Sequence, residues 1–283
     1  ADTADTRWWK QFRDPVLDQL IIEGLAHNSN IAIAAVNVEQ AAALLTQSRS
    51  LLFPQLGYAA TGERQRSLEP AFAALLRNYP NPSTAYEAAL SASWEIDLWG
   101  RIRRQSEAAL ANLLVTDEAR RGVILSLVAS VANSYLQLRG LDAQLQVARK
   151  TLSTYGESVR LFELQFKYGQ VSKMNVVQAQ SQYESAAAQI PLLESQIAQN
   201  QNALAVLIGR DPGPIARGKS VDELALPPVP AGLPSALLEQ RPDLLQAEQA
   251  LVAANAQIGA ARALYFPAIS LTGAFGGASS ELS

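Results

Sequence analysis

Apolar and polar residues alternate along one short segment of the chain. From Leu90 to Leu98 every even-numbered position is apolar and every odd-numbered position is polar. Successive side chains of a β-strand point to opposite faces, so the pattern predicts a strand with one apolar face and one polar, acidic face. Ile269–Phe275 repeats the alternation, and Leu56–Ala60 repeats it more weakly. The sequence therefore predicts three such strands.

A helical period begins after Gly100. No proline lies between Pro82 and Pro191, and from Gly100 to about Phe166 apolar residues recur at spacings of three and four. Proline breaks helix interiors, so this segment predicts one continuous helix with a narrow apolar stripe. At 1.5 Å per residue, about 67 residues span roughly 100 Å, more than the diameter of a globular core. From the periodicity alone, a coiled-coil spacer is an equally good interpretation.

This helix is expected to end at Lys167–Ser172. Gly169 suits the left-handed conformation that ends a helix, and Ser172 can cap the next one. A second helix then runs from about Lys173 to Ile208, with Pro191 as a kink. The two limbs predict an antiparallel hairpin with a tight tip.

The end of the chain resembles its beginning at an offset of 213 residues. The ordered match places Arg49 on Arg262 and Phe53-Pro54 on Phe266-Pro267. Each copy reads as a short helix, a helix of about 22 residues, then Phe-Pro and an alternating run. We expect structural contacts rather than substrate binding for six residues in or near the copies: Arg49, Pro54, Arg241, Asp243, Arg262 and Pro267.

These patterns divide the chain into five segments. Residues 1–52 hold an N-terminal part and the first-copy helix, 53–99 a strand pair with a connecting loop, and 100–208 the long hairpin. Residues 209–234 form a linker with six prolines, and 235–283 begin the second copy. The predicted fold class is mainly α with a small β part.

Composition removes several classes of protein. The chain has no cysteine and a single histidine, His27, which excludes cysteine-built metal sites and multi-histidine sites. A net charge of -3 argues against nucleic-acid binding. No stretch approaches the ~18 consecutive apolar residues of a membrane-spanning helix. We expect no enzymatic activity, no cofactor and no metal, and a surface or capping role for His27.

One motif is a decoy. Gly213–Ser220 matches the phosphate-binding spelling G-x-x-x-x-G-K-[ST]. That loop works only between a strand and a helix whose N-terminus faces the phosphates. Here the upstream segment reads as helix and prolines follow closely, so we expect no nucleotide binding.

Longer strings carry a family resemblance. They are Trp8–Leu17, Phe53-Pro54, Trp94–Arg101, Arg241–Leu244, Phe266-Pro267 and the tip Lys167–Ser172. In this order they resemble the outer membrane efflux protein family, the TolC-like channels of tripartite exporters, especially the NodT-type lipoprotein branch. The string Trp-Glu-Ile-Asp-Leu-Trp-Gly-Arg is the most specific of them.

The resemblance implies an architecture and a function. A homotrimer would form one continuous passive duct in the bacterial outer membrane, with four strands per subunit in a twelve-stranded barrel and long helices in a periplasmic α-barrel tunnel. Its partners would be a periplasmic adaptor protein, an inner-membrane pump of the RND type and outer-membrane lipid. The family pattern also has a fourth strand and a second long hairpin, which are expected to be missing after Ser283, and an N-terminal lipidated cysteine, which the sequence does not show.

Three groups of residues are candidates for this function. We expect the polar strand positions to face the lumen and to favour cations: Ser91, Ser93, Glu95 and Asp97. We expect the apolar positions to face lipid, with Trp99 in an interfacial girdle: Leu90, Trp94, Ile96 and Leu98. The tip is the expected docking site for the adaptor: Tyr168, Gly169, Gln170, Val171 and Ser172.

Simpler interpretations remain open for each group. The strands also suit a half-buried sheet of a soluble protein, and polar residues near a rim need no role in conduction. The tip glycine is also explained by a tight turn. As a whole, the alternative function is a soluble coiled-coil interaction or scaffold protein.

Overall fold

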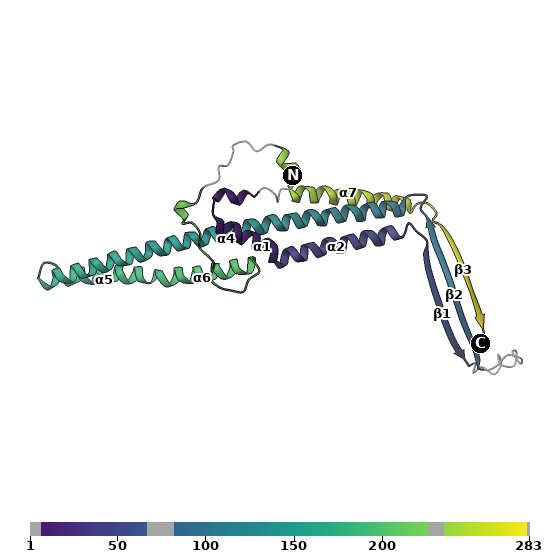
Figure 1. The fold of residues 1–283 in the computed structure, drawn as a ribbon, viewed down its shortest axis with the longest axis horizontal. Coiled ribbons are helices and arrows are strands. Elements are labelled where there is room, and N and C mark those ends of the chain that lie inside the picture. Colours follow the sequence, from purple (N-terminus) through teal and green to yellow (C-terminus); the bar gives the residue numbers. More distant parts are fainter. Residues whose placement is uncertain (1–6, 67–81, 226–234, 282–283) are drawn as a thin grey trace. The chain divides into compact units, whose positions relative to one another are not determined.

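The computed structural model describes residues 7–66, 82–225 and 235–281, so the predicted strand loop and part of the linker lie outside the described residues. Helices dominate and one small antiparallel sheet accompanies them, which confirms the predicted fold class (Figure 1). In chain order the elements are η2 Trp8–Phe12, α1 Pro15–His27, α2 Ser29–Ser50, β1 Gln55–Gln65, β2 Ser83–Ile96, α4 Arg101–Lys167, α5 Lys173–Ala187, α6 Gln189–Leu207, η3 Val221–Glu223, η4 Ser235–Gln240, α7 Pro242–Ala263 and β3 Ile269–Ser279. None of the described helices combines the length and the apolar character needed to cross a membrane.

The long helix is confirmed almost to the residue. α4 has 67 residues and ends at Lys167, where Gly169 takes a φ of 73°. The backbone N–H of Gln170 donates to the carbonyl of Gln165 at 2.9 Å and closes the helix end. Ser172 stands at the N-cap of α5 as predicted, but its hydroxyl makes no cap bond and donates to the Asn175 side chain instead.

The predicted kink in the second limb is present, three residues before Pro191. α5 ends at Ala187 and α6 begins at Gln189, with a turn at Ala188. Pro191 has no N–H to donate to the carbonyl of Ala187, and its ring crowds the turn before it. The break therefore lies in the turn that precedes the proline.

The chain forms two compact units. The first comprises residues 1–37 and 117–245, and the second comprises 38–116 and 246–283. Each unit has its own packing, and the long helices α2, α4 and α7 pass from one to the other.

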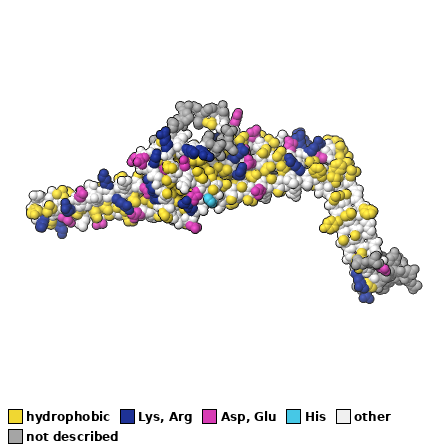
Figure 2. All heavy atoms as spheres, in the orientation of Figure 1, with side chains coloured by type: hydrophobic (Ala, Val, Ile, Leu, Met, Phe, Trp, Pro, Cys, Tyr) yellow, Lys and Arg dark blue, Asp and Glu magenta, His cyan; other side chains and the backbone are white. Residues whose placement is uncertain are grey.

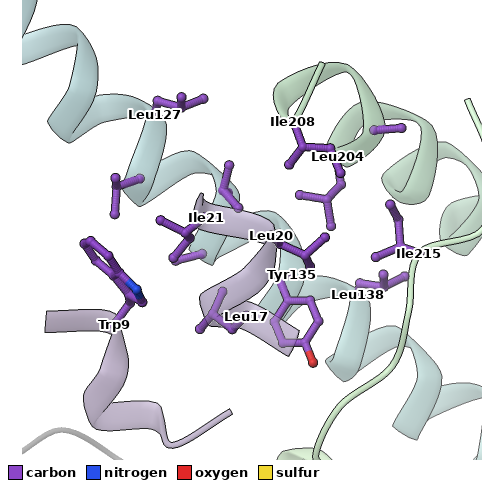
Figure 3. Packing of buried hydrophobic residues seen from close by; sticks show 14 of the residues in the cluster. Trp9, Leu17, Leu20, Ile21, Leu127, Tyr135, Leu138, Leu204, Ile208 and Ile215 are labelled. Atoms are coloured by element: carbon purple, nitrogen blue, oxygen red, sulfur yellow. The ribbon is translucent and has the colours of Figure 1, made fainter. Parts of the chain in front are cut away.

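The core of the first unit lies where α1, α4 and α6 meet (Figure 3). α4 contributes Val131, Tyr135 and Leu138, whose spacings of four and three put them on one face of the helix. α1 presents Leu17 and α6 presents Leu204 to the same cluster, and neither has any exposed surface. The apolar stripe that the sequence predicts on the long helix is thus the buried face of this unit.

The sheet of the second unit has the strand order β1-β2-β3, and both pairs are antiparallel. Leu90 pairs with Tyr58 on one side and with Phe275 on the other. β2 begins at Ser83 and ends at Ile96, so the prediction that Asp97 and Leu98 belong to the strand is wrong. The reason is local, because Asp97 binds the first backbone N–H groups of α4 and caps that helix.

The internal repeat is visible in the element lengths. α2 and α7 each have 22 residues, and their bounds differ by the predicted 213 positions at both ends. β1 and β3 each have 11 residues. Pro54 stands directly before β1 and Pro267 two residues before β3, so each copy leaves its helix and enters its strand in the same way.

Candidate functional site

One face of the sheet is apolar and exposed. Tyr58, Leu90 and Phe275 form a row across the three strands, and they are 88%, 61% and 82% exposed. Directly opposed residues of antiparallel strands lie on the same face, so the pairs Trp94–Leu271 and Ile96–Ile269 extend this row along β2. Figure 2 shows hydrophobic side chains over the sheet and densely where the strands meet the helices. An apolar face of this size is unusual on a protein surrounded by water.

The opposite face of the sheet is small and polar. Ser91 pairs with Gly57 and Ala274, and Ser93 pairs with Gln55 and Thr272. Gly276, on the same face, is required by close backbone approach, because a Cβ there would lie 2.4 Å from the carbonyl oxygen of Ala88. Ser91, Ser93 and Glu95 therefore share one face, and Leu90, Trp94 and Ile96 share the other.

The two acidic residues at the end of β2 are paired with arginines. The Arg101 guanidinium donates to both carboxylate oxygens of Glu95, at 3.0 and 2.6 Å. Asp97 accepts from the backbone N–H groups of Ile102 and Arg103, at 3.0 and 2.8 Å, and from the Arg103 side chain. The two carboxylates that are expected to favour cations are thus each paired with an arginine six positions further along the sequence.

The pKa of Asp97 shows which of its contacts dominate. Burial opposes the charged carboxylate, but the backbone N–H donors of Arg103 and Ile102 and the Arg103 guanidinium favour it. Together they hold the pKa of Asp97 below its usual value. Asp97 is therefore ionised at neutral pH and serves as a helix cap.

Two tryptophans tie the strand–helix connections together. The Trp99 indole N–H donates to the carbonyl of Pro267 at 2.9 Å, and its ring stacks on Phe266 with centroids 4.5 Å apart. The Trp94 indole N–H donates to the carbonyl of Leu52 at 3.0 Å. Trp99 thus joins the connection after β2 to the connection before β3, and Trp94 joins the end of β2 to the connection before β1.

The hairpin tip is an exposed turn. Tyr168 is 70% exposed, and a Cβ added at Gly169 would meet open space, so this glycine is needed for its positive φ alone. The sequence interpretation missed the apolar residues around the turn, which lie on the outer faces of α4 and α5. They are Leu161, Leu164, Phe166, Met174 and Val177, all exposed by 45% to 74%.

A buried polar cluster fastens the linker to the start of α1 and to α4 within the first unit. Asp14 caps α1 through the backbone N–H of Val16 and accepts from the Tyr135 hydroxyl at 2.7 Å and from the Lys219 N–H at 3.1 Å. The Tyr135 oxygen in turn accepts from the Gly218 N–H at 3.0 Å. Burial, and then the hydrogen bond to Asp14, raises the pKa of Tyr135 to about 12. Sequence reasoning missed this cluster, for which the only signal was an Asp-Pro pair at a helix start.

The same contacts dispose of the phosphate-loop motif. Gly218 and Lys219 direct their N–H groups at Tyr135 and Asp14. The motif follows helix α6, and η3 after it has only three residues. Within the described residues the element directly before this loop is a helix rather than a strand, and the element directly after it is too short to be the helix that a phosphate loop needs, in agreement with the prediction.

The six repeat residues divide into two kinds. Arg241 and Asp243 form a local ion pair with two hydrogen bonds, at 3.0 and 2.6 Å. Arg49 and Arg262 make no hydrogen bond or ion pair with any described residue, and the structural contacts expected for them stay a prediction. Within the same described ranges no group of acidic residues and histidine is arranged to hold a metal ion.

Comparison with known proteins gives a family and near relatives. The model of the family described as "Outer membrane efflux protein" matches residues 20–210 and 233–283. The toluene efflux pump outer membrane protein TtgF of Pseudomonas putida is 40% identical, over 99% of this chain and 58% of TtgF. The cation efflux system protein CusC of Escherichia coli is 37% identical, over 100% of this chain and 60% of CusC. The chain thus spans less than two thirds of the length of these relatives.

Solved structures agree with the sequence matches. Crystal structures of CusC, described in connection with transmembrane channel formation, align with a TM-score of 0.85 at 35% identity, over 100% of this chain and 65% of theirs. The open state of the outer membrane channel MtrE of Neisseria gonorrhoeae aligns with a TM-score of 0.80 at 36% identity, over 95% of this chain and 59% of MtrE.

The matched residues include most of the elements described above. The family model covers all three strands, the whole helical hairpin and α7. TtgF and MtrE are outer-membrane proteins by name, which confirms the location predicted from the sequence. The chain belongs to the outer membrane efflux protein family.

Proposed function

We propose that the chain is part of the subunit of an outer-membrane efflux channel, a passive duct in a tripartite system with an RND-type inner-membrane pump and a periplasmic adaptor. The observation that carries this proposal is a sheet with one exposed apolar face and one small polar face, joined at β2 to a helix of 67 residues. No catalytic step is part of this function.

The sheet is proposed to form one part of a transmembrane barrel. Leu90, Trp94 and Ile96 face lipid, and Ser91, Ser93 and Glu95 face the lumen, as alternation in such barrels requires. Three strands do not close a barrel, so further strands complete it, as in a homotrimer. The apolar row Tyr58–Leu90–Phe275 supports this arrangement, because exposed apolar side chains are unfavourable in water but not in the hydrocarbon of a membrane.

The lumen is proposed to select weakly. Passive pores discriminate by aperture and by the charge of their lining. Arg101 neutralises Glu95 and Arg103 neutralises Asp97, so these two carboxylates add little net charge to the lumen and any cation preference that they give is weak. The related proteins TtgF and CusC are named for toluene and for cation efflux at similar identity, which suits a duct whose pump chooses the substrate.

The hairpin tip is proposed to dock the adaptor. Tyr168, Gly169, Gln170, Val171 and Ser172 form the turn, and exposed apolar side chains surround it on both helices. Lys167 and Lys173 flank the turn with positive charge. In-cell cross-linking from Gln170 tests this proposal, and failure to capture an adaptor would contradict it.

Single cysteines test the orientation of the sheet, since the chain has no cysteine of its own. In intact outer membranes Ser91→Cys should react with a water-soluble maleimide through the lumen, whereas Leu90→Cys should react only after detergent extraction. A soluble coiled-coil scaffold predicts rapid labelling of both, because Leu90 is 61% exposed in the sheet. Heat-resistant trimers in outer-membrane detergent extracts provide an independent test of the homotrimer.

A further inference from the structure

The three connections between strands and helices lie at one end of the sheet. Ile96 pairs with Ile269 at this end, and β1 begins opposite Ser93, so all three strands meet their helices here. Every connection carries exposed aromatic side chains. They are Phe53 at 66%, Trp99 at 48%, Tyr265 at 88% and Phe266 at 51% exposed. Aromatic side chains gather in this way where hydrocarbon gives way to water.

Arginines border the same connections on the helix side. Five arginines lie in the adjoining helix ends: Arg49, Arg101, Arg103, Arg104 and Arg262. Three of them are neutralised by carboxylates, in the pairs Arg101–Glu95 at 2.6 Å, Arg103–Asp97 at 3.3 Å and Arg104–Glu107 at 2.7 Å. Two positive charges are left over at this rim.

The two remaining charges belong to Arg49 and Arg262. Both side chains are exposed, and neither makes a hydrogen bond or ion pair with any residue in the described ranges. They occupy the same position in the two copies, in the last helical turn and four residues before Phe53 or Phe266. A cation in the last turn also interacts favourably with the helix dipole, which accounts for a charge there but not for the aromatic side chains beside it.

We propose that Arg49 and Arg262 bind the phosphate groups of membrane phospholipids at the rim where the apolar face of the sheet ends. This inference rests on the proposed function, because it needs the sheet to lie in a membrane. A guanidinium can bind a phosphate through two parallel hydrogen bonds. Neither Arg49 nor Arg262 is paired with a carboxylate of the described residues, so both guanidinium groups are available for a phosphate. The exposed aromatic side chains hold the lipid boundary at the level of these two arginines.

Phospholipid binding to the protein purified from outer membranes tests the proposal. Native mass spectrometry would count phosphatidylglycerol molecules bound to wild type, to the double variant Arg49→Gln/Arg262→Gln and to Arg49→Lys/Arg262→Lys. A matched control is Arg160→Gln, since Arg160 is exposed on α4 and has no ion pair among the described residues. Near a membrane surface each basic residue contributes about a fivefold gain in affinity, so the double glutamine variant should bind roughly thirtyfold more weakly.

The outcomes separate this inference from the function on which it rests. Loss in the glutamine variant, with retention in the lysine variant and in Arg160→Gln, supports the two arginines as phosphate ligands. Unchanged binding in the glutamine variant, or equal loss in the lysine or control variant, overturns the proposal. Recovery of the protein in the outer-membrane fraction reports on the proposed function separately and does not depend on the lipid count.

Discussion

The hydroxyl of Tyr135 is expected to stabilise the packing of the linker against α1 and α4. It donates to the buried carboxylate of Asp14 at 2.7 Å and accepts the N–H of Gly218 at 3.0 Å. Tyr135 has no exposed surface, so the change Tyr135→Phe removes both bonds without adding volume and without letting water in. The variant leaves a buried N–H without its acceptor and deprives Asp14 of one donor.

The magnitude follows from these two losses. A hydrogen bond to a charged group contributes about 1.5–3 kcal/mol, and an orphaned buried donor costs about 1–3 kcal/mol. The two effects share one oxygen atom and do not add fully, so we expect the opening of the linker to become easier by about 2–4 kcal/mol. Amide hydrogen exchange at Gly218 and Lys219 should then be roughly thirty- to a thousandfold faster.

Hydrogen exchange followed by mass spectrometry measures this effect by region. Peptides that cover the linker up to Ser220 should lose protection in Tyr135→Phe, whereas peptides from β2 should not change. Tyr155→Phe is the matched control, because the Tyr155 hydroxyl makes no hydrogen bond within the described residues. Unchanged linker protection in Tyr135→Phe, or equal loss in the control, would refute the role given to this hydroxyl.

Three further predictions concern pH, a helix cap and a close approach. The pKa of Tyr135 is raised to about 12, so the protonated hydroxyl contributes fully to stability below pH 10 and this contribution is lost as the pH rises through 12. Ultraviolet titration should find a tyrosine that ionises near pH 12 in wild type and not in Tyr135→Phe. Asp97→Ala should lower the free energy of unfolding in detergent by about 1–2 kcal/mol. Asp97→Asn should lower it by less, because the single amide oxygen of Asn keeps one of the two cap bonds that the two carboxylate oxygens accept; equal losses would contradict the capping role. Gly209→Ala should destabilise the protein by about 3 kcal/mol or more, since Gly209 has a φ of 76° and a Cβ would lie 2.5 Å from the carbonyl oxygen of His27. Gly122→Ala, in open space on α4, should instead stabilise the protein by up to about 1 kcal/mol, and thermal unfolding in detergent distinguishes the two.

Sequence periodicity predicted the parts of the fold that depend on local spacing. The continuous helix α4 and the alternating faces of β2 follow from repeats of 3.6 and 2 residues. Such repeats can be recognised within one stretch of sequence, without knowledge of distant contacts. The end of β2 was placed two residues too late because alternation continues through Asp97 and Leu98, while a competing helix cap ends the strand.

Contacts between distant residues were beyond the sequence pattern. Asp14 meets Tyr135 across 121 positions and Lys219 across 205, and no spacing rule relates them. The ion pairs of Glu95 and Asp97 were within reach, because an acidic strand end followed by three arginines at a helix start is a local signal. Periodicity does not reveal which arginines near the strand–helix connections lack a carboxylate partner. In the described residues these are Arg49 and Arg262.

The equivalent strands of the two copies, β1 and β3, pair with β2 at different heights along it. Tyr58 of the first copy lies opposite Leu90 of β2, and its counterpart in the second copy, Leu271, lies opposite Trp94. Equivalent positions are therefore displaced by four residues on β2, or about 13 Å at 3.3 Å per residue. A sheet whose copies advance in this way has strands inclined to the axis around which it curls. Duplication of one helix–strand unit with this step thus sets the slant of the strands, while the even displacement keeps every large apolar side chain on the same side of the sheet.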